Sequence, residues 1–264
     1  MGQNFLVEKR VGTAMLKTAN ITKKDTVLEV GPGLGTLTLE LAREAKKVVA
    51  VEKDLALVEI LKETLKDLPN VEVIHGDILS LTKLSFPQLN LVKDARHPRY
   101  KVVANLPYYL TSHFIRLFLE LKDKPSRMTL MVQKEVAQRI TAKPPEMSLL
   151  AVSVQFYAEA KLITSVKKTA FWPVPKIDSA ILHIVVREKQ PVQDSRQFFT
   201  VAKAGFAHPR KQLGNNLAAG LHMPKEEVAE LLKEADIPPS LRAETLFLED
   251  WARLAKSFPV ENLT

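Results

Sequence analysis

Short apolar runs rich in β-branched residues alternate with stretches of helical periodicity through the first two thirds of the chain. The runs predict strands over residues 26–30, 47–51, 71–75, 100–104 and 128–132. Helical patterns follow several of them, through Leu37, Leu41 and Ala42 after the first strand and over 111–121 after the fourth. A strand, a glycine turn and a helix form the first unit of a nucleotide-binding α/β fold. We therefore expect an α/β domain built on an open sheet.

Residues 148–158 fit two patterns. Apolar positions 149, 152 and 156 have helical spacing, whereas residues 152–156 alternate as in a strand. Periodicity alone leaves both alternatives open. Strand-like runs follow over 161–166 and 180–186.

The last third of the chain changes character after a polar linker at 188–194. Beyond the linker the pattern is helical over 198–206, 225–234 and 248–258, and it contains no plausible strand. We therefore predict two domains, an α/β domain over 1–188 and a small all-α domain over 195–264. The irregular, proline-containing stretch 82–99 is interpreted as a surface connection within the first domain.

The tetrapeptide Asn105-Leu106-Pro107-Tyr108 lies between a predicted strand and the following helix. Ligands of open α/β sheets bind at the carboxyl ends of strands. Asn105 offers a side-chain carbonyl, Pro107 stiffens the turn and biases Leu106 away from helix, and Tyr108 offers a flat face for stacking. These groups suit the task of holding a planar amino group for attack. The alternative is an ordinary turn in which Asn caps the helix and Pro opens it.

The glycine turn after the first strand reads Gly31-Pro32-Gly33-Leu34-Gly35, and acidic residues follow the next two strands. Glu52 ends the second strand, where an acidic residue can accept hydrogen bonds from ribose hydroxyls. Asp77 ends the third strand and can accept from an amino group such as adenine N6. Each of these two acidic residues could instead cap a helix.

Two cofactor classes compete for this arrangement. A dinucleotide site needs G-x-G-x-x-G with phosphates on the helix N-terminus. Here the third glycine falls one position early and Pro32 removes a backbone donor. Both departures matter little for S-adenosylmethionine, which has no phosphates and needs only close backbone approach to its methionine arm. The set of glycine turn, Glu52 and Asp77 therefore favours S-adenosylmethionine.

Composition narrows the possible partners. The formal charge is +8, and the pI is about 9.5, which favours a polyanion such as nucleic acid, although a merely soluble basic surface would have the same charge. The chain has no cysteine, so disulfides, thiol catalysis and cysteine zinc sites are excluded. Its histidines are scattered without metal-ligand spacing, and we expect no metal. No membrane span or secretory signal is recognisable, and we expect a cytoplasmic protein.

Two further segments carry candidate residues. Prolines 173 and 175 make the segment around Phe171 a stiff extended loop that cannot join a central strand. Such a loop can hold Phe171 at the edge of a pocket, and the alternative is packing in the core. In the helical domain, a basic and amide cluster suits phosphate and sugar contacts, although a solvated helix face would look alike. The cluster consists of Arg210, Lys211, Asn215 and Asn216.

Taken together, these motifs resemble the ribosomal RNA small subunit methyltransferase A family, the adenine dimethyltransferases of small-subunit (16S) rRNA. The resemblance runs from residue 2 to about residue 258. Its carriers are Gly-Gln-Asn-Phe-Leu at 2–6, Glu-Val-Gly-Pro-Gly-Leu-Gly at 29–35, Asn-Leu-Pro-Tyr at 105–108, Gln-Lys-Glu-Val at 133–136, Phe-Trp-Pro-Val-Pro-Lys-Ile-Asp-Ser-Ala at 171–180 and the stretch 206–217.

The resemblance implies a Rossmann-like, S-adenosylmethionine-dependent methyltransferase domain with one antiparallel strand, and a helical RNA-facing domain. It implies that residues 148–158 are helical. It places Phe171 with Tyr108 at the target base, beside the catalytic Asn105, Leu106 and Pro107. The cofactor contacts that it implies are Gln3, Asn4, Leu6, Gly31, Gly33, Glu52, Lys53, Asp77, Ile78 and Asn105.

The expected reaction is transfer of methyl groups to N6 of two adjacent adenosines near the 3′ end of 16S rRNA, within a small-subunit precursor particle. We expect a monomer without a membrane partner. The nearest alternative is the related large-subunit (23S) rRNA dimethyltransferase of the macrolide-resistance type. A ribosome-assembly factor acting mainly by binding is a second alternative, and a nicotinamide-dependent oxidoreductase, disfavoured by the glycine spacing, is a third.

Overall fold

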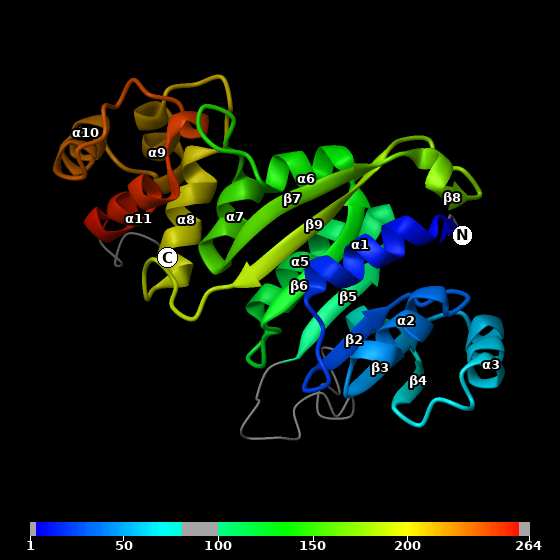
Figure 1. Cartoon of the computed structure of the whole chain (residues 1–264). Coiled ribbons are helices and arrows are strands. Elements are labelled where there is room, and N and C mark those ends of the chain that lie inside the picture. Colours follow the sequence, from blue (N-terminus) through cyan, green and yellow to red (C-terminus); the bar gives the residue numbers. More distant parts are fainter. Residues whose placement is uncertain (1–3, 81–99, 259–264) are drawn as a thin grey trace. The chain divides into compact units, whose positions relative to one another are not determined.

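The computed structural model describes residues 4–80 and 100–258, which Figure 1 shows in colour. The predicted surface connection at 82–99 lies outside these residues. Contacts divide the chain into two compact units. The first combines residues 1–137 with 160–186, and the second combines residues 138–159 with 187–264.

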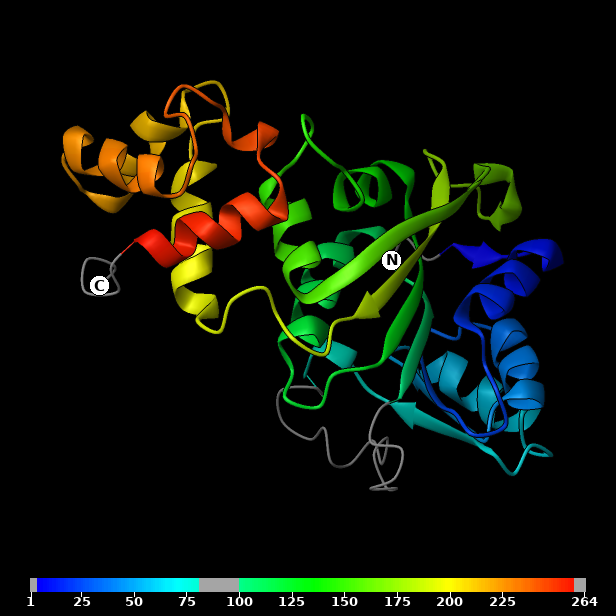
Figure 2. The same cartoon turned by 60° about the vertical axis from the view of Figure 1, so that its left-hand side comes forward.

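The first unit is built on a seven-stranded sheet, which Figures 1 and 2 show from two sides. The strand order is β4 (Val71–His75), β3 (Lys47–Glu52), β2 (Thr26–Val30), β5 (Lys101–Asn105), β6 (Arg127–Gln133), β9 (Ser179–Val186) and β7 (Ala158–Val166). The first five strands in this order are parallel, and β9 is antiparallel to β6. All seven predicted strands are confirmed, and so is the α/β fold with one antiparallel strand.

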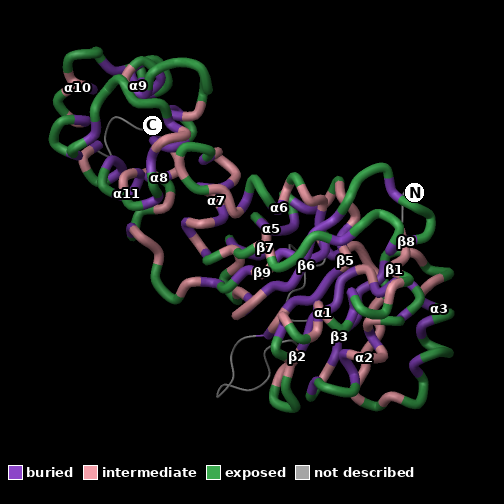
Figure 3. Tube along the Cα trace, turned by 45° about the horizontal axis from the view of Figure 1, so that its top comes forward, coloured by how far each residue is buried: buried purple, intermediate pink, exposed green. Residues whose placement is uncertain are grey.

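The central strands are buried along almost their whole length, as Figure 3 shows for β5 and β6. Strands covered by helices on both faces need apolar residues at every position, which explains their continuous apolar runs. Helix α1 packs against β5, β6 and β9. The helices of this unit are α1 (Lys9–Ala19), α2 (Thr36–Glu44), α3 (Leu55–Thr64), the short 3-10 helix η2 (Tyr108–Leu110) and α5 (Thr111–Glu120), while α6 (Lys134–Ile140) crosses the division between the units.

A second, two-stranded sheet joins the beginning of the chain to the proline-rich loop. Strand β1 (Phe5–Leu6) pairs antiparallel with β8 (Phe171–Trp172), with Phe5 opposite Trp172 and Leu6 opposite Phe171. The proline-rich segment therefore stays out of the central sheet, as predicted. The pairing across more than 160 residues was not expected from the sequence, because two-residue strands have no readable periodicity.

The second unit is helical. Its core includes the fully buried Phe156, Phe198, Trp251 and Phe258. The helices are α7 (Leu149–Tyr157), α8 (Ser195–Gly205), α9 (Leu213–Leu221), α10 (Lys225–Glu234) and α11 (Leu248–Ser257), with a 3-10 turn η4 (Ala243–Thr245).

Helix α7 resolves the ambiguity of residues 148–158 in favour of helix. Ser148 caps it by accepting a hydrogen bond from the Ala151 N–H at 3.2 Å. The spacing of apolar residues was uninformative here, because most residues of α7 are apolar and several of its faces are buried. The structure groups α7 with the C-terminal helices, whereas the sequence-based division placed it in residues 1–188. The functional division into 1–188 and 195–264 stays a prediction.

Helix α9 was missed by the sequence analysis. Gly214, Asn215 and Gly220 are weak helix formers, and they obscured the pattern. The signal that could have found it is the spacing of the buried residues Leu213, Leu217 and Leu221.

Gly220 is the point of closest approach between α9 and α8. A Cβ at this position would lie 2.8 Å from the Ala204 Cβ and 2.9 Å from its Cα. Relieving this overlap would require the backbone of α8 or α9 to shift. We expect Gly220→Ala to lower the free energy of unfolding by about 1–3 kcal/mol, although alanine has the higher helix propensity, which opposes this loss. Urea unfolding measures this. The neighbouring exposed Ala219→Ser serves as control and should change stability by less than about 0.5 kcal/mol. A stabilised Gly220→Ala variant would contradict the close contact.

Candidate functional site

The glycine turn and the Asn-Leu-Pro-Tyr turn meet at the carboxyl edge of the sheet. Strands β2 and β5 are parallel neighbours, with Val30 opposite Ala104. The residues that follow, Gly31 and Asn105, therefore lie side by side. A Cβ on Gly31 would come within 3.8 Å of the Asn105 carbonyl oxygen, and Gly31 has φ of +69°, in the left-handed region that favours glycine. The sequence prediction that these two turns form one site agrees with this geometry.

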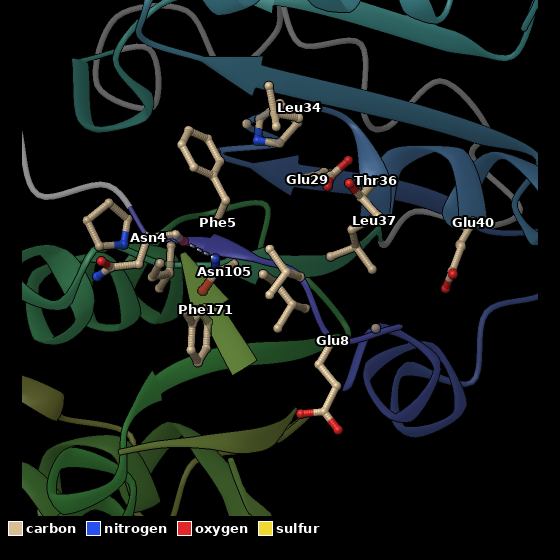
Figure 4. A pocket seen from close by; sticks show the side chains of 18 of the residues that line it. Asn4, Phe5, Glu8, Glu29, Leu34, Thr36, Leu37, Glu40, Asn105 and Phe171 are labelled. Carbon is tan, nitrogen blue, oxygen red and sulfur yellow. Dashed lines mark hydrogen bonds between the residues drawn. The ribbon is translucent and has the colours of Figure 1, made fainter. Parts of the chain in front are cut away.

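A cavity of about 290 Å³ opens between these two turns and the beginning of the chain. Figure 4 shows side chains from β1, the glycine turn, α2 and the Asn-Leu-Pro-Tyr turn around it. The lining residues are Asn4, Phe5, Leu6, Val7, Glu8, Lys9, Gly12, Glu29, Gly31, Pro32, Gly33, Leu34, Thr36, Leu37, Glu40, Asn105, Leu106, Pro107, Tyr108 and Phe171.

The side-chain amide of Asn105 is held in one orientation. Its Nδ2 donates a hydrogen bond to the backbone carbonyl of Asn4 at 3.1 Å, drawn as a dashed line in Figure 4. Because the amino group is engaged in this way, Oδ1 is left as an acceptor. Asn105 caps no helix: the residue that precedes η2 is Pro107, and no side chain caps η2. The alternative of a capping Asn is therefore wrong, and the backbone of the lead-in segment at Asn4 contributes to the site.

Aromatic residues flank the amide. The Tyr108 hydroxyl lies 2.8 Å from the Ser179 hydroxyl, which fixes the ring at the start of β9. Phe171 is only 2% exposed and packs in the apolar core with residues such as Met131 and Ile181. It also lines the cavity, so both alternatives for Phe171, core packing and pocket edge, describe its position.

Glu52 organises the glycine turn from the neighbouring strand end. Its Oε2 accepts a hydrogen bond from the Gly33 N–H at 3.2 Å. Its Oε1 accepts from the Lys53 N–H at 2.8 Å and from the Asp54 N–H at 3.0 Å. The helix cap of α3 is Asp54, so Glu52 is a clamp on two turns and not the cap of that helix.

Asp77 follows β4 and is engaged on both carboxylate oxygens. Oδ2 forms an ion pair with the Lys53 ammonium at 2.9 Å, and Oδ1 accepts from the Leu79 N–H at 3.0 Å. The Lys53 hydrogen bond and the Leu79 N–H hold the pKa of Asp77 below its usual range, against the opposing effect of partial burial. The hydrogen bond from the Leu79 N–H is the contact expected if Asp77 caps a helix, which was the alternative interpretation of this residue. Ile78 is buried beside it.

The structure thus separates the predicted cofactor residues into two groups. Asn4, Leu6, Gly31, Gly33 and Asn105 line the cavity. Glu52, Lys53, Asp77 and Ile78 lie at the ends of β3 and β4, beyond the lining of this cavity. Gln3 lies outside the described residues.

Glu29 lines the cavity and was not singled out as a contact by the sequence analysis. It is 1% exposed, and its Oε2 has no hydrogen-bond partner within the described part of the chain. Burial raises the pKa of Glu29 to about 8, the nearby Glu52 carboxylate adds to this, and the Thr38 hydroxyl opposes it. A carboxyl group inside the apolar run Val27-Leu28-Glu29-Val30 was the available signal, since a buried carboxyl needs a reason.

The predicted RNA cluster is only partly exposed. Arg210, Lys211 and Asn215 are exposed in the helical unit. Asn216 is 1% exposed, and its Nδ2 donates to the carbonyls of Gly205 at 2.7 Å and His208 at 3.0 Å. The inclusion of Asn216 among RNA contacts is therefore corrected: its amide holds the turn after α8 and does not face solvent.

Two kinds of feature are absent from residues 4–80 and 100–258. No helix there is long and apolar enough to cross a membrane. No group of three or more His, Cys, Asp or Glu side chains there could hold a metal ion.

Comparison with known proteins gives the family. The model of the family described as ribosomal RNA adenine dimethylase matches residues 1–259. The chain belongs to this family. It is an enzyme that dimethylates adenine in ribosomal RNA, and its family implies a methyl donor of the S-adenosylmethionine type. The resemblance inferred from the sequence is confirmed.

Curated members of the dimethylase family are similar over nearly the whole chain. A protein of Dehalococcoides mccartyi (strain CBDB1) named ribosomal RNA small subunit methyltransferase A is 45% identical over 98% of this chain and 87% of its own. A protein of the same name from Clostridioides difficile (strain 630) is 40% identical over 97% of this chain and 88% of its own.

Solved structures confirm the Rossmann-like methyltransferase fold with a helical C-terminal part. The 23S rRNA methyltransferase ErmE has a TM-score of 0.77 at 26% identity, covering 96% of this chain and 99% of its own. A dimethyladenosine transferase from Plasmodium falciparum has a TM-score of 0.81 at 23% identity, covering 95% of each chain. At that identity the second likeness shows the fold alone.

Glu29 gives the dimethylase a testable pH dependence of stability. Its pKa is raised from 4.5 in the unfolded chain to about 8 in the folded one, so the folded state binds the extra proton. Stability is therefore lost as pH rises from about 4.5 through about 8. We expect Glu29→Gln, which cannot ionise, to be more stable than the parent at pH 8 by on the order of 4 kcal/mol, with the difference shrinking towards pH 5. Chemical denaturation at several pH values measures this, and a difference independent of pH would contradict the assignment.

Proposed function

We propose that this dimethylase transfers methyl groups from S-adenosylmethionine to N6 of two adjacent adenosines near the 3′ end of small-subunit (16S) rRNA, during maturation of the small subunit. The carrying observation is the Asn105 amide, whose nitrogen is tied to the Asn4 carbonyl at 3.1 Å beside the cavity and the glycine turn. Relatives at 40–45% identity bear the small-subunit name, which supports that substrate.

The charges around the cavity favour a cationic donor. The carboxylates of Glu8 and Glu40 line it, Glu29 adds a buried carboxyl that is mostly protonated near neutral pH, and Lys9 is the lysine among the lining residues. Pro32 lacks the N–H that a phosphate would use. A dinucleotide would bring phosphates to an acidic wall, whereas S-adenosylmethionine brings a sulfonium and an ammonium group. The residues present therefore fit S-adenosylmethionine, which supplies when bound a methyl group on positively charged sulfur.

The polar turn prepares the target nitrogen. The lone pair of an adenine amino group is delocalised into the ring, which makes the neutral nitrogen a poor nucleophile. The Asn105 Oδ1 accepts one of its two protons. The Leu106 carbonyl is suited to the second, because it receives no hydrogen bond from any described residue, whereas the Pro107 carbonyl already accepts from the Leu110 N–H at 2.9 Å. Two acceptors in fixed positions favour a more tetrahedral nitrogen and aim its lone pair at the donor.

Positioning and stacking carry the remaining part of the proposal. Orientation of two reactants can lower a barrier by about 7–11 kcal/mol, and no strong base is needed because the amino proton becomes acidic once nitrogen carries positive charge. The adenine must be extruded from its stack, and Tyr108 and Phe171 offer it aromatic faces worth about 1–3 kcal/mol each. A second transfer requires that the same pocket accept the monomethylated amine.

The groups outside the cavity have proposed roles as well. Glu52 is suited to ribose hydroxyls and Asp77 to the adenine amino group of the donor, with Gln3, Lys53 and Ile78 beside them. Lys53 already pairs with Asp77, so donor binding competes with or rearranges this exposed ion pair. For the substrate, the exposed Arg210, Lys211 and Asn215 are suited to phosphates and sugars, in a helical RNA-facing domain proposed to span residues 195–264.

A single reaction tests the substrate. The protein is incubated with labelled S-adenosylmethionine and under-methylated small subunits, and the modified nucleotides are mapped. We expect two adjacent dimethyladenosines near the 3′ end. Isolated large subunits are the comparison, because ErmE, at 26% identity, is a 23S rRNA methyltransferase. Labelling of large subunits alone would reject the proposal. Rescue of subunit maturation by a catalytically dead variant would show that binding contributes an assembly role.

The role of Asn105 is tested by substitution. We expect Asn105→Ala to lower the rate of transfer by at least about 10²–10³-fold, since one preorganised hydrogen-bonding group is lost, while donor binding is partly retained. Asn105→Asp keeps an acceptor but removes the donor to the Asn4 carbonyl, and we expect an intermediate rate. Single-turnover transfer and calorimetric donor binding measure the two effects separately. Unchanged transfer in Asn105→Ala would refute the mechanism.

A further inference from the structure

Trp172 is an exposed tryptophan next to a buried phenylalanine. Successive side chains of a strand point to opposite sides, and in β8 this puts Phe171 inward, at 2% exposure, and Trp172 outward, at 66% exposure. Tryptophan is highly buried on average, so this exposure needs an explanation. The other tryptophan of the chain, Trp251, is 1% exposed.

The position of Trp172 beside the cavity is secured by backbone contacts. Trp172 is paired with Phe5, which lines the cavity, and it follows Phe171, which lines it too. The Val7 N–H donates to the Ala170 carbonyl at 2.9 Å and extends this attachment. The exposed indole is therefore carried on the same two-stranded sheet that forms one wall of the cavity.

Three exposed lysines flank this strand in the sequence. Lys167, Lys168 and Lys176 are exposed, and none forms an ion pair within the described part of the chain. The Lys168 N–H donates to Asp178 Oδ1 at 2.9 Å, which brings the two sides of the loop together. Asp178 is the acidic residue of this segment, so the net charge of residues 167–178 is positive.

We propose that Trp172, Lys167, Lys168 and Lys176, here called the Trp172 ledge, bind the single-stranded rRNA that flanks the target adenosine. The inference rests on the proposed function, because it takes the cavity beside the ledge as the place of the extruded adenine. The indole stacks on a neighbouring base, and the lysines contact phosphates of the same strand. No contact of this kind was predicted from the sequence, where the RNA contacts were placed in the helical domain.

An exposed indole next to several lysines is suited to binding single-stranded nucleic acid. Stacking of bases on aromatic side chains next to cationic groups is the usual way of holding a single strand without reading its sequence. A base next to an extruded adenosine has lost a stacking neighbour, and the exposed indole, on the strand that also carries the cavity-lining Phe171, replaces it. The unpaired lysines complement the phosphates of such a strand, as the overall charge of +8 does.

Intrinsic fluorescence tests the stacking directly. A single-stranded RNA oligonucleotide with two adjacent adenosines is titrated into the full-length protein without donor. We expect quenching of the exposed emission and protection of it from acrylamide, because Trp172 is exposed and Trp251 is buried. The same titration of Trp172→Phe supplies the Trp251 background. Quenching that is equal in Trp172→Phe and the parent would overturn the stacking contact.

Methylation kinetics on under-methylated small subunits test whether stacking on Trp172 contributes to substrate binding. We expect Trp172→Ala to raise KM for the subunit by about 5- to 150-fold, the range for loss of one base–aromatic stack, and more than it lowers kcat. Trp172→Phe should restore most of the loss, because a smaller aromatic face remains. Equal KM values for the parent and both variants would overturn the proposal, and so would a defect that Phe fails to reduce.

The salt dependence of RNA binding tests the lysines. The triple change Lys167→Gln, Lys168→Gln and Lys176→Gln should flatten the slope of log affinity against log salt by about 2, at about 0.7 for each phosphate contact with a single strand. The control is a triple change of exposed lysines near the opposite ends of the strands. It consists of Lys17→Gln, Lys24→Gln and Lys46→Gln, which alters net charge equally. Equal slopes for the two triple variants would overturn the proposal.

Failure of this inference and failure of the proposed function give different results. Asn105→Ala, which lacks the catalytic amide, should still show quenching of Trp172 by the oligonucleotide. Quenching without methylation of small subunits would reject the proposed function and retain the ledge as an RNA contact. Methylation with normal KM and no quenching would retain the function and reject the ledge.

Discussion

Parallel pairing of β2 with β3 and β5 is the constraint from which the site follows. Because parallel neighbours end at the same edge, one register brings the glycine turn, the Glu52 carboxylate and Asn105 together. Glu52 then clamps the turn through the Gly33 N–H, and Gly31 allows the backbone to approach Asn105 closely. A slip of one residue in either pairing would turn these side chains to the other face of the sheet.

The cavity is completed by segments far from the sheet edge in sequence. Strand β1 brings the Asn4 carbonyl to the amide of Asn105, and its partner β8 brings Phe171 to the same wall. The fold thus holds the amide in one orientation, which the proposed mechanism requires of a preorganised group. The two-stranded sheet also separates two tasks: Phe171 faces the cavity and Trp172 faces solvent.

Stability and function oppose each other at Glu29. Burial without a partner for Oε2 raises its pKa to about 8 and costs folding free energy near neutral pH. In the proposed function, a cationic donor would supply this partner and would offset the cost on binding. Uncompensated buried polar groups of this kind are concentrated at functional sites. The second unit, by contrast, uses its buried Asn216 amide structurally, by satisfying two carbonyls after α8.

The sequence by itself determined the strands and the α/β class, because continuous apolar runs and turn residues are local signals. That the Asn-Leu-Pro-Tyr turn and the glycine turn share one site was implied only by the family resemblance. Tertiary structure alone decided that β1 pairs with β8 and that α9 exists. It also confirmed the helix at 149–157, which periodicity left open and the family resemblance implied. It also decided that Asn216 is buried and that Glu29 lines the cavity. These outcomes depend on contacts between residues that are distant in the chain. Secondary-structure propensity and apolar periodicity are local properties, so they do not indicate which distant residues come into contact.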